Sequence, residues 1–371
     1  MTLEQKQPKA RVLAYYLPQF HPIPENDEWW GKGFTEWTNV GKAKPLFPGH
    51  YQPHVPADLG YYDLRVPETR EAQAELARKY GVEGFVYWHY WFAGKRLLER
   101  PFNEVLASGK PDFPFALAWA NETWRGFGHG LSTERQTLIE QTYPGDEDYI
   151  AHFNAVLPAF KDKRYITCEG KPIFVIYQAA QLPDAKHFIE LWQQLSKKNG
   201  LPGIYFIAHE MEAQKDDDVK QRYAARIAEG FDAVNYVNKY YHSTKQLPFF
   251  VRVLRFMFHK REKMRKLPNI CPYDVKVFRT CLDKEDKVFP SIVPNWDHTP
   301  RSGLRGTVVY GSTPEKFGEA VKYAVEAVKD KPQDKHFVFI KSWNEWAEGN
   351  YMEPDLQWGC QYLEQIAKYV L

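Results

Sequence analysis

Eight short apolar runs, each followed by a stretch with helical periodicity, constrain the fold of this sequence more than any other feature. Such alternation predicts parallel strands, because a helix returns the chain to the end of the sheet from which each strand starts. Eight strand–helix units predict a closed (β/α)8 barrel rather than an open doubly wound sheet. The expected strands are residues 12–17, 84–90, 115–119, 173–177, 204–208, 231–236, 289–294 and 337–341.

The open-sheet alternative lacks its usual signature. A dinucleotide-binding sheet carries GxGxxG after its first strand, whereas PQFH follows the first apolar run here. We therefore expect residues 1–371 to form one barrel domain, interrupted by an insertion at residues 239–288. Seven helices are expected at residues 67–80, 95–107, 147–160, 184–198, 216–229, 314–329 and 356–370, and the insertion follows the sixth strand, at residues 231–236.

Polar and aromatic side chains gather at the carboxyl ends of the predicted strands. In a (β/α)8 barrel these ends converge on one face, where the following loops build the active site. We expect Trp88, Trp119, Trp296 and Trp346 to line the mouth of the pocket as platforms for sugar rings. The full set of candidate substrate-binding residues is Tyr16, Gln19, His21, Trp88, His89, Trp119, Asn121, Glu122, Tyr177, His209, Glu210, Trp296, Asp297, Asn344 and Trp346.

The last expected strand leads into the strongest chemical signal. After residues 337–341 the chain continues SWNEWAEGNYMEPD, which holds Glu345, Glu348 and Glu353 among tryptophans. Indole faces stack on sugar rings, and paired carboxylates act on the glycosidic oxygen and its neighbours. Two close carboxylates raise one pKa, so that identical residue types can serve as an acid and a base. Glu122 or Glu210 could supply the nucleophile that ordinary retaining glycosidases use.

The segment SWNEWAEG, with Glu353 and Pro354 downstream, resembles the catalytic segment of glycoside hydrolase family 99, the endo-α-mannosidases. The resemblance implies retaining chemistry on an α-mannose-like residue of a microbial glycan. It implies Glu345 as the base on the substrate 2-hydroxyl and Glu348 as the general acid/base at the glycosidic oxygen. It further implies attack by that hydroxyl to give a 1,2-anhydro sugar, without a protein nucleophile. Ala347 departs from that family, in which His is common at this position.

Four further blocks resemble the WbsX-type proteins of bacterial polysaccharide clusters, which are related to that hydrolase family and often labelled glycosyltransferases. The resemblance implies a (β/α)8 fold over nearly the whole chain. The blocks are AYYLPQFHPIPENDEWWGKGFTEWTNV, GFVYWHYWF, FALAWANETWR and VPNWDHTPR.

Three functions remain open. The first is retaining hydrolysis of an α-mannose-like residue, and the second is glycosyl transfer in the biosynthesis of a surface polysaccharide such as an O-antigen or capsule. Residues 216–218 are three aspartates that formally fit the DxD pattern of metal-dependent glycosyltransferases. They open a polar helix, where acids favour the positive helix end. The third function is a non-catalytic glycan-binding barrel, which requires Glu345 and Glu348 to point away from the pocket.

Basic residues concentrate in the insertion. Residues 239–281 hold eleven Lys or Arg against two acids, a net charge of +9 in a chain whose total is +2. Phe249, Phe250, Phe256 and Phe258 are interleaved with the charges. The pattern predicts a helical hairpin on the catalytic rim that contacts an anionic membrane or a lipid-linked glycan. The alternative is a helical insert packed on the barrel with its lysines in water, and nothing indicates a nucleic-acid partner.

The remaining signals concern cofactors and location. The sequence has no HExxH and no clustered His/Cys spacing, which predicts neither a metal nor a cofactor. Four cysteines without CxxC spacing predict unpaired thiols in a reducing compartment. No apolar run fits a signal peptide or a transmembrane helix. We expect a cytoplasmic protein, either free or peripheral at the inner membrane face, that acts on an oligosaccharide or polysaccharide.

Overall fold

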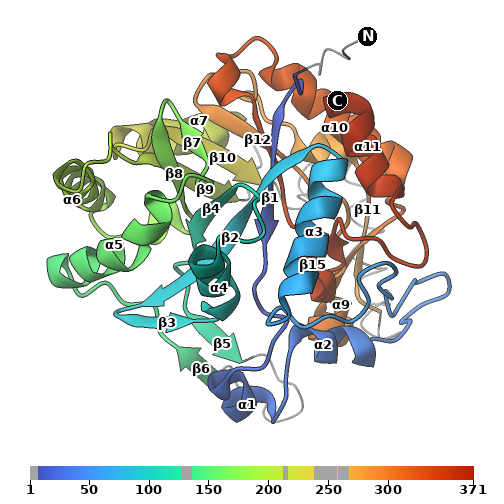
Figure 1. Cartoon of the computed structure of the whole chain (residues 1–371). Helices are drawn as coiled ribbons and strands as arrows, with labels where there is room; N and C mark the ends of the chain where they lie inside the picture. Colours follow the sequence, from blue (N-terminus) through green and yellow to red (C-terminus); the bar gives the residue numbers. More distant parts are fainter. Residues whose placement is uncertain (1–6, 127–135, 212–215, 238–256, 258–266) are drawn as a thin grey trace, which may run out of the picture.

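The computed structural model describes residues 7–126, 136–211, 216–237, 257 and 267–371. Its centre is a closed barrel of parallel strands, in which β1 pairs with both β2 and β14 (Figure 1). The predicted (β/α)8 fold is therefore confirmed. In order around the barrel the strands are β1 (Arg11–Tyr16), β2 (Val82–Phe92), β4 (Phe115–Trp119), β8 (Lys171–Ile176), β9 (Tyr205–Met211), β10 (Ala233–Val237), β12 (Val288–Ile292) and β14 (Phe337–Ile340).

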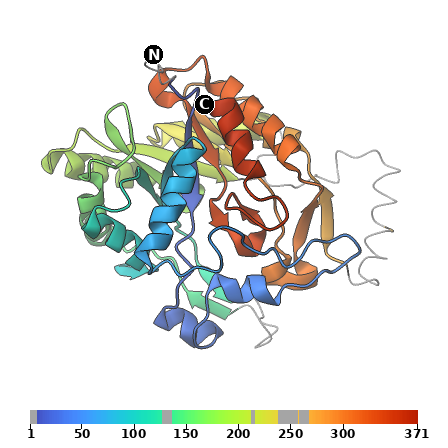
Figure 2. The ribbon, with the colours of Figure 1, turned by 45° about the vertical axis from the view of Figure 1, so that its right-hand side comes forward.

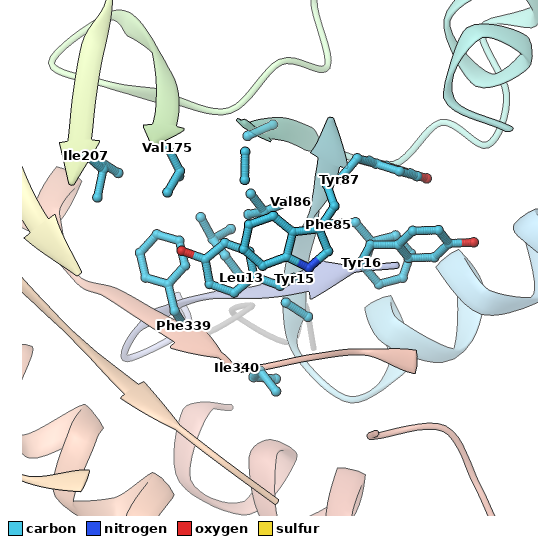
Figure 3. Packing of buried hydrophobic residues seen from close by; sticks show 14 of the residues in the cluster. Leu13, Tyr15, Tyr16, Phe85, Val86, Tyr87, Val175, Ile207, Phe339 and Ile340 are labelled. Carbon is cyan, nitrogen blue, oxygen red and sulfur yellow. The ribbon is translucent and has the colours of Figure 1, made fainter. Parts of the chain in front are cut away.

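The strands are apolar on both faces because helices cover the outside and side chains fill the inside. Along β1, Tyr15 points into the barrel, where its ring lies 5.5 Å from that of Phe339 and 4.7 Å from that of Trp88. Tyr16 points outward and donates a hydrogen bond to Gln73 of α3. Figure 3 shows this division, with Leu13, Tyr15 and Phe339 together and Tyr16 on the other side.

The outer layer consists of helices that alternate with the barrel strands (Figure 1). They are α3 (Pro67–Lys79), α4 (Arg100–Ser108), α5 (Asp146–Phe160), α6 (Ala185–Lys198), α7 (Asp216–Ala228), α10 (Pro314–Val328) and α11 (Gln361–Val370). Short elements between them are β7 (Thr167–Cys168), η1 (Ala179–Gln181), η3 (Val275–Phe278), η4 (Gly303–Arg305) and η5 (Gln333–Lys335).

Two predicted helices begin later than expected. Residues 95–97 form β3 (Lys95–Leu97), which pairs antiparallel with the end of β2 before α4 begins. The reversal is a two-residue turn at Ala93 and Gly94, both with positive φ, the geometry that suits tight hairpins. The predicted helix at residues 356–370 begins only at Gln361. The Asp355 carboxylate accepts hydrogen bonds from the backbone N–H groups of Gln357 and Trp358 and holds these residues in a turn.

Additional elements gather at the carboxyl ends of the strands, at the lower end of the barrel in Figure 1. Figure 2 shows α2 and α9 together at this end, where they are in contact. These elements are α1 (Pro24–Trp30), α2 (Glu36–Lys42), the hairpin of β5 (Trp124–Gly126) and β6 (Gln136–Ile139), α9 (Thr299–Ser302), and the hairpin of β15 (Asn344–Glu345) and β16 (Asn350–Tyr351) joined by η6 (Trp346–Glu348).

The predicted insertion is described only in part. Its described carboxyl-terminal portion contains β11 (Asn269–Pro272), which pairs in parallel with β13 (Thr307–Tyr310), a strand that the sequence pattern did not indicate. The predicted helical hairpin covered residues 239–281, but its described part, residues 267–281, forms β11 and the 3-10 turn η3 rather than a helix, because residues 269–272 pair with β13. The four phenylalanines at positions 249, 250, 256 and 258 lie outside the described residues, so the membrane contact stays a prediction.

Two further findings concern the chain as described. The cysteines at positions 168, 271, 281 and 360 form no disulfide. Within the described ranges, no helix combines the length and the apolar character needed to cross a bilayer.

Candidate active site

Glu345 and Glu348 lie on the short hairpin that follows β14. Its strands pair antiparallel, with Glu345 opposite Asn350, and a single 3-10 turn joins them. Side chains three residues apart in a 3-10 helix point the same way, because that helix has three residues per turn. The two glutamates therefore project from one side of the hairpin and line the same cavity.

Asn344 ties the hairpin to the end of β1. Its side-chain nitrogen donates to the Leu17 carbonyl oxygen at 3.0 Å, and its Oδ1 accepts from the Leu17 backbone nitrogen at 2.8 Å. The Trp343 backbone nitrogen donates to the Tyr15 carbonyl at 2.7 Å. The hairpin is thus fixed to the first strand of the barrel as well as to the last.

Glu353 holds the hairpin from behind. Its carboxylate accepts from Trp346 Nε1 at 2.6 Å, from Gln73 Nε2 at 2.6 Å and from the Tyr62 hydroxyl at 2.9 Å. Burial raises the pKa of Glu353 to about 7, although these hydrogen bonds act in the opposite direction. Because its partners are protein groups, Glu353 positions Trp346 and the turn around it.

Arg301 of α9 bridges the two glutamates. One terminal nitrogen lies 3.2 Å from Glu345 Oε1 and 2.5 Å from Glu348 Oε1. Its Nε lies 3.1 Å from Oε2 of Glu36, the first residue of α2. Three carboxylates, one from α2 and two from the hairpin, share this guanidinium, so the cluster carries more negative than positive charge when all its acids are ionised.

The cluster holds a proton that titrates near neutral pH. Burial and the charge of Glu348 raise the pKa of Glu345 to about 7, although Arg301 and Lys341 oppose the shift. His298 Nε2 lies 3.5 Å from Glu348 Oε1. Burial and Arg301 lower the pKa of His298 to about 4, so its ring is neutral at neutral pH. A proton available near neutral pH suits general acid–base chemistry.

The two glutamates face a cavity of about 530 Å³, which we call the catalytic cavity. Trp88 and Tyr177 form one aromatic wall, with ring centroids 5.1 Å apart and ring planes at 79°. Trp296 stacks parallel to His298 on another wall. The volume is in the range of small-ligand pockets, and aromatic side chains in the lining suit sugar rings. The predicted residues that line it are Gln19, Trp88, Glu122, Tyr177, Trp296, Glu345 and Glu348.

Glu122 and Lys341 bring further charges to the catalytic cavity. Burial raises the pKa of Glu122, and the charges of Glu348 and Glu345 act in the same direction. Lys341, which directly follows β14, opposes that shift, and its Nζ lies 6.0 Å from the ring centroid of Trp88. Basic and acidic side chains therefore line the catalytic cavity together.

Other predicted residues support the catalytic cavity from inside the barrel. His209 stacks on Tyr177 with ring centroids 5.2 Å apart, and its Nδ1 lies 3.1 Å from Asn235 Oδ1. Asn121 Oδ1 accepts from the backbone nitrogen of Gln178 at 2.7 Å, which links the ends of β4 and β8. These contacts hold Tyr177 and the neighbouring Gln178 in place.

Several predicted residues face the helices instead. His89 Nε2 lies 2.9 Å from Nε2 of His152 on α5. The indole of Trp119 donates to the Trp91 carbonyl oxygen at 3.2 Å and is almost completely buried. Glu210 faces Arg222 and Arg226 of α7 at 3.4 and 3.6 Å. The predicted residues that do not line the catalytic cavity are Tyr16, His21, His89, Trp119, Asn121, His209, Glu210, Asp297, Asn344 and Trp346.

Asp297 lies inside the wall behind the hairpin. Its Oδ2 accepts from His50 Nε2 at 2.7 Å and Gln52 Nε2 at 2.6 Å, and its Oδ1 accepts from the backbone and hydroxyl of Thr299. Burial raises the pKa of Asp297, but these hydrogen bonds outweigh it, so the pKa is lowered. Its backbone nitrogen donates to the Glu348 carbonyl at 2.6 Å, which joins the two loops.

Sequence reasoning missed several residues of the catalytic cavity, including Glu36, Tyr90, Trp124, Arg301 and Lys341. Two signals were available. Arg301 lies in the block VPNWDHTPR, and Glu36 lies in the long loop after the first strand. Neither position shows by itself which distant carboxylate or guanidinium it meets.

The aspartates at positions 216–218 open α7 as predicted, and Asp218 pairs with Arg222 at 3.0 Å. Over the described ranges, no group of three or more His, Cys, Asp and Glu side chains is arranged to hold a metal ion.

The chain is similar to proteins of known families over nearly its full length. The family model described as glycosyltransferase WbsX matches residues 12–366. The uncharacterized protein WxcX of Xanthomonas campestris pv. campestris, from two strains, is 34% identical over 369 residues. That alignment covers 96% of this chain and 49% of WxcX, so the chain spans about half the length of the curated relatives that it matches.

Two solved structures share the architecture. A glycoside hydrolase-like protein superposes with a TM-score of 0.59 at 16% identity, covering 99% of this chain and 95% of that chain. The GH99 endo-α-mannosidase from Bacteroides thetaiotaomicron gives 0.54 at 14% identity, covering 97% and 96%. At these identities the likeness shows the shared barrel fold.

Proposed function

We propose, from the premise that the chain belongs to the WbsX glycosyltransferase family, that it is a carbohydrate-active enzyme acting on a glycosidic bond of an oligosaccharide or polysaccharide. The family match confirms the resemblance predicted from the sequence blocks. The observation that carries the proposal is the placement of Glu345 and Glu348 on one side of a cavity walled by Trp88 and Trp296. Aromatic faces bind the ring while the acids act at the bond that is broken or made.

The proposed chemistry divides proton transfer between the two glutamates. Glu348 acts as general acid/base at the glycosidic oxygen and Glu345 as the base on the substrate 2-hydroxyl, as the resemblance to the family 99 segment implies. Arg301 keeps both carboxylates in place and stabilises their ionised forms. A pKa of about 7 makes Glu345 a base that can take up a proton near neutral pH.

Hydrolysis of an α-mannose-like residue is the activity that we propose first. The acid pair and its resemblance to the endo-α-mannosidase segment support it, because such a pair needs only water as the acceptor. Glycosyl transfer into a surface polysaccharide is the second candidate, and the family description supports it. Both reactions use the same cavity and differ in the acceptor. A purely glycan-binding role is disfavoured, because both carboxylates line the cavity rather than point away from it.

The test incubates the purified protein with a panel of α-mannose-containing glycans, with and without nucleotide sugars, and identifies products by mass spectrometry. Wild-type protein is expected to shorten or extend a glycan. Glu345→Gln and Glu348→Gln are each expected to lower the rate by at least about a hundredfold. Near-normal rates in both variants would contradict the assignment and shift attention to Glu122.

Asp217→Asn is the matched control. This acid is exposed on the first turn of α7 and belongs to the DxD-like run. The variant is expected to keep the wild-type rate. Loss of a nucleotide-sugar-dependent activity in Asp217→Asn, with normal rates in the two glutamate variants, would instead favour a metal-dependent transferase built around the aspartate run.

A further inference from the structure

We propose that a second cavity, behind the hairpin of Glu345 and Glu348, binds one neutral sugar residue at a site separate from the catalytic cavity. The rear cavity, as we call it, has a volume of about 230 Å³. Its lining comes from residues 49–54, 294–297, 308–312 and 349–362. The proposal concerns binding alone, and it requires neither hydrolysis nor transfer in the catalytic cavity.

One wall separates the two cavities, and successive residues of that wall face opposite sides. Trp296 and His298 line the catalytic cavity, whereas Asn295 and Asp297 line the rear cavity. Gly349 also lines the rear cavity, directly after Glu348 has faced the other way. The rear cavity is therefore an independent site, yet its occupant would contact the chain segments that carry the catalytic candidates.

The two cavities differ in the charge of the ligand that they can bind. Among the described residues that line the rear cavity none is Lys or Arg, whereas Asp297, Glu353 and Asp355 bring carboxylates to it. An anionic ligand, such as a uronate or a sugar nucleotide, would meet these acids without a cation to neutralise it. A neutral polyol avoids this cost because it carries no charge.

Aromatic side chains give the rear cavity the surface that sugars require. It is lined by Tyr51, Tyr310, Tyr351, Trp358 and Tyr362. Tyr310 is 51% exposed, and Trp358 is half-buried at the rim. Flat rings with one face open to solvent accept the C–H face of a pyranose.

Polar groups at the rear cavity are either held in place or available to a ligand. A chain of hydrogen bonds runs from His54 Nδ1 through the Tyr351 hydroxyl to Asp355 Oδ2, with both distances 2.5 Å. Gln357 lines the rear cavity and is exposed, so its side-chain amide can donate to and accept from sugar hydroxyls.

The volume limits the size of the ligand. Pockets for drug-sized ligands occupy about 300–1,000 Å³, so the rear cavity is too small for an extended oligosaccharide. One ring, either a free monosaccharide or a single unit of a longer glycan that passes over the rim, fits the available space.

The experiment locates binding by fluorine NMR on protein labelled with fluorotryptophan. Trp358→Phe identifies the resonance of Trp358 among the 12 tryptophans. The probes are methyl α-mannopyranoside and methyl α-glucopyranoside as neutral sugars and methyl glucuronide as the anion. We expect both neutral probes to shift the Trp358 resonance with Kd about 1–10 mM, and the glucuronide to bind at least about tenfold more weakly.

Matched variants separate the two cavities. Tyr310→Ala, which removes an exposed platform of the rear cavity, is expected to weaken the Trp358 titration by at least about fivefold. Trp296→Ala, which removes a platform of the catalytic cavity, is expected to leave it unchanged. The double variant Glu345→Gln/Glu348→Gln is expected to titrate as the wild type does, so inactivity in the catalytic cavity and absence of binding in the rear cavity are distinguishable.

Three results would overturn the inference. The first is no movement of the Trp358 resonance up to about 100 mM neutral sugar. The second is loss of the shift in Trp296→Ala with retention in Tyr310→Ala, because the ligand would then occupy the catalytic cavity alone. The third is equal affinity for the glucuronide, which would contradict selection by charge.

Discussion

Glu345 and Asp297 line different cavities on the two sides of one wall, and their surroundings shift the pKa of the carboxyl group in opposite directions. Asp297 accepts hydrogen bonds from His50, Gln52 and Thr299, so its pKa is lowered despite burial. Glu345 is buried and has a second carboxylate beside it, so its pKa is raised to about 7, although Arg301 lies 3.2 Å away. A carboxylate whose oxygens all accept hydrogen bonds stabilises the fold, whereas a buried carboxyl group with few hydrogen-bond donors around it keeps a proton that can be transferred in a reaction.

The largest expected effect is on the activity of a Glu345 variant. Glu345→Gln should lower turnover by at least about a hundredfold, or about 2.7 kcal/mol in the barrier, because the amide cannot take up the proton. Its melting temperature should equal or exceed that of the wild type, since a desolvated acid has been removed. Product formation and thermal denaturation measure the two quantities. A large loss of stability in this variant would break the comparison.

The second effect tests Asp297. Asp297→Asn should lower the free energy of unfolding by about 2 kcal/mol, because an amide group turned toward the donors of His50 and Gln52 leaves buried hydrogen bonds unmade. Urea denaturation measures the change. A difference below about 0.5 kcal/mol would show that these donors find other acceptors, and Asp297 would lose its proposed role in stability.

The third effect concerns pH. The raised pKa of Glu345 means that the folded state binds more protons than the unfolded state between about pH 4.5 and 7. The contribution of Glu345 to stability should therefore fall as the pH rises through this window, by about 1–3 kcal/mol, and then level off. Glu345→Gln should remove this contribution, so the melting temperature of the variant relative to that of the wild type should increase with pH across the window. An identical slope in wild type and variant would contradict the raised pKa.

The smallest effect probes the wall itself at Gly349. Its φ is +58°, and a Cβ placed there would lie 2.9 Å from Asp297 Cβ and 3.0 Å from the Asp297 backbone nitrogen. Gly349→Ala should lower the free energy of unfolding by about 1–2 kcal/mol through left-handed strain and this contact. Unfolding curves measure it. A neutral Gly349→Ala variant would show that the wall can shift, and that the two sides are less independent than proposed.

The barrel was predictable because its signal is local. Each strand is a short apolar run, such as residues 115–119, and the helix that follows shows its own period within about a dozen residues. The errors fall where a few side chains override the pattern. Residues 95–97 became a strand because a tight turn lies at Ala93 and Gly94, and the turn capped by Asp355 delayed the last helix.

The candidate site was predictable only in its parts. The position of Glu345 and Glu348 after a strand placed them at the correct end of the barrel. The sequence did not show that Glu36 and Arg301, separated by 265 positions, meet in one ion pair. Nor did it separate Trp296, which lines the cavity, from Trp119, which faces the helices, because both follow the same kind of apolar run.

The hydrogen bonds between Asn344 and Leu17 have a consequence for biosynthesis. A ribosome releases the segment of β1 long before that of β14, yet the two strands are neighbours in the barrel. Until residues 337–344 emerge, the nascent chain holds an incomplete sheet whose open edges can pair with other chains. Closure of the barrel and assembly of the Glu345–Glu348 pair should therefore occur in the same late event. Chains truncated before position 337 are expected to aggregate rather than to persist as partly active fragments.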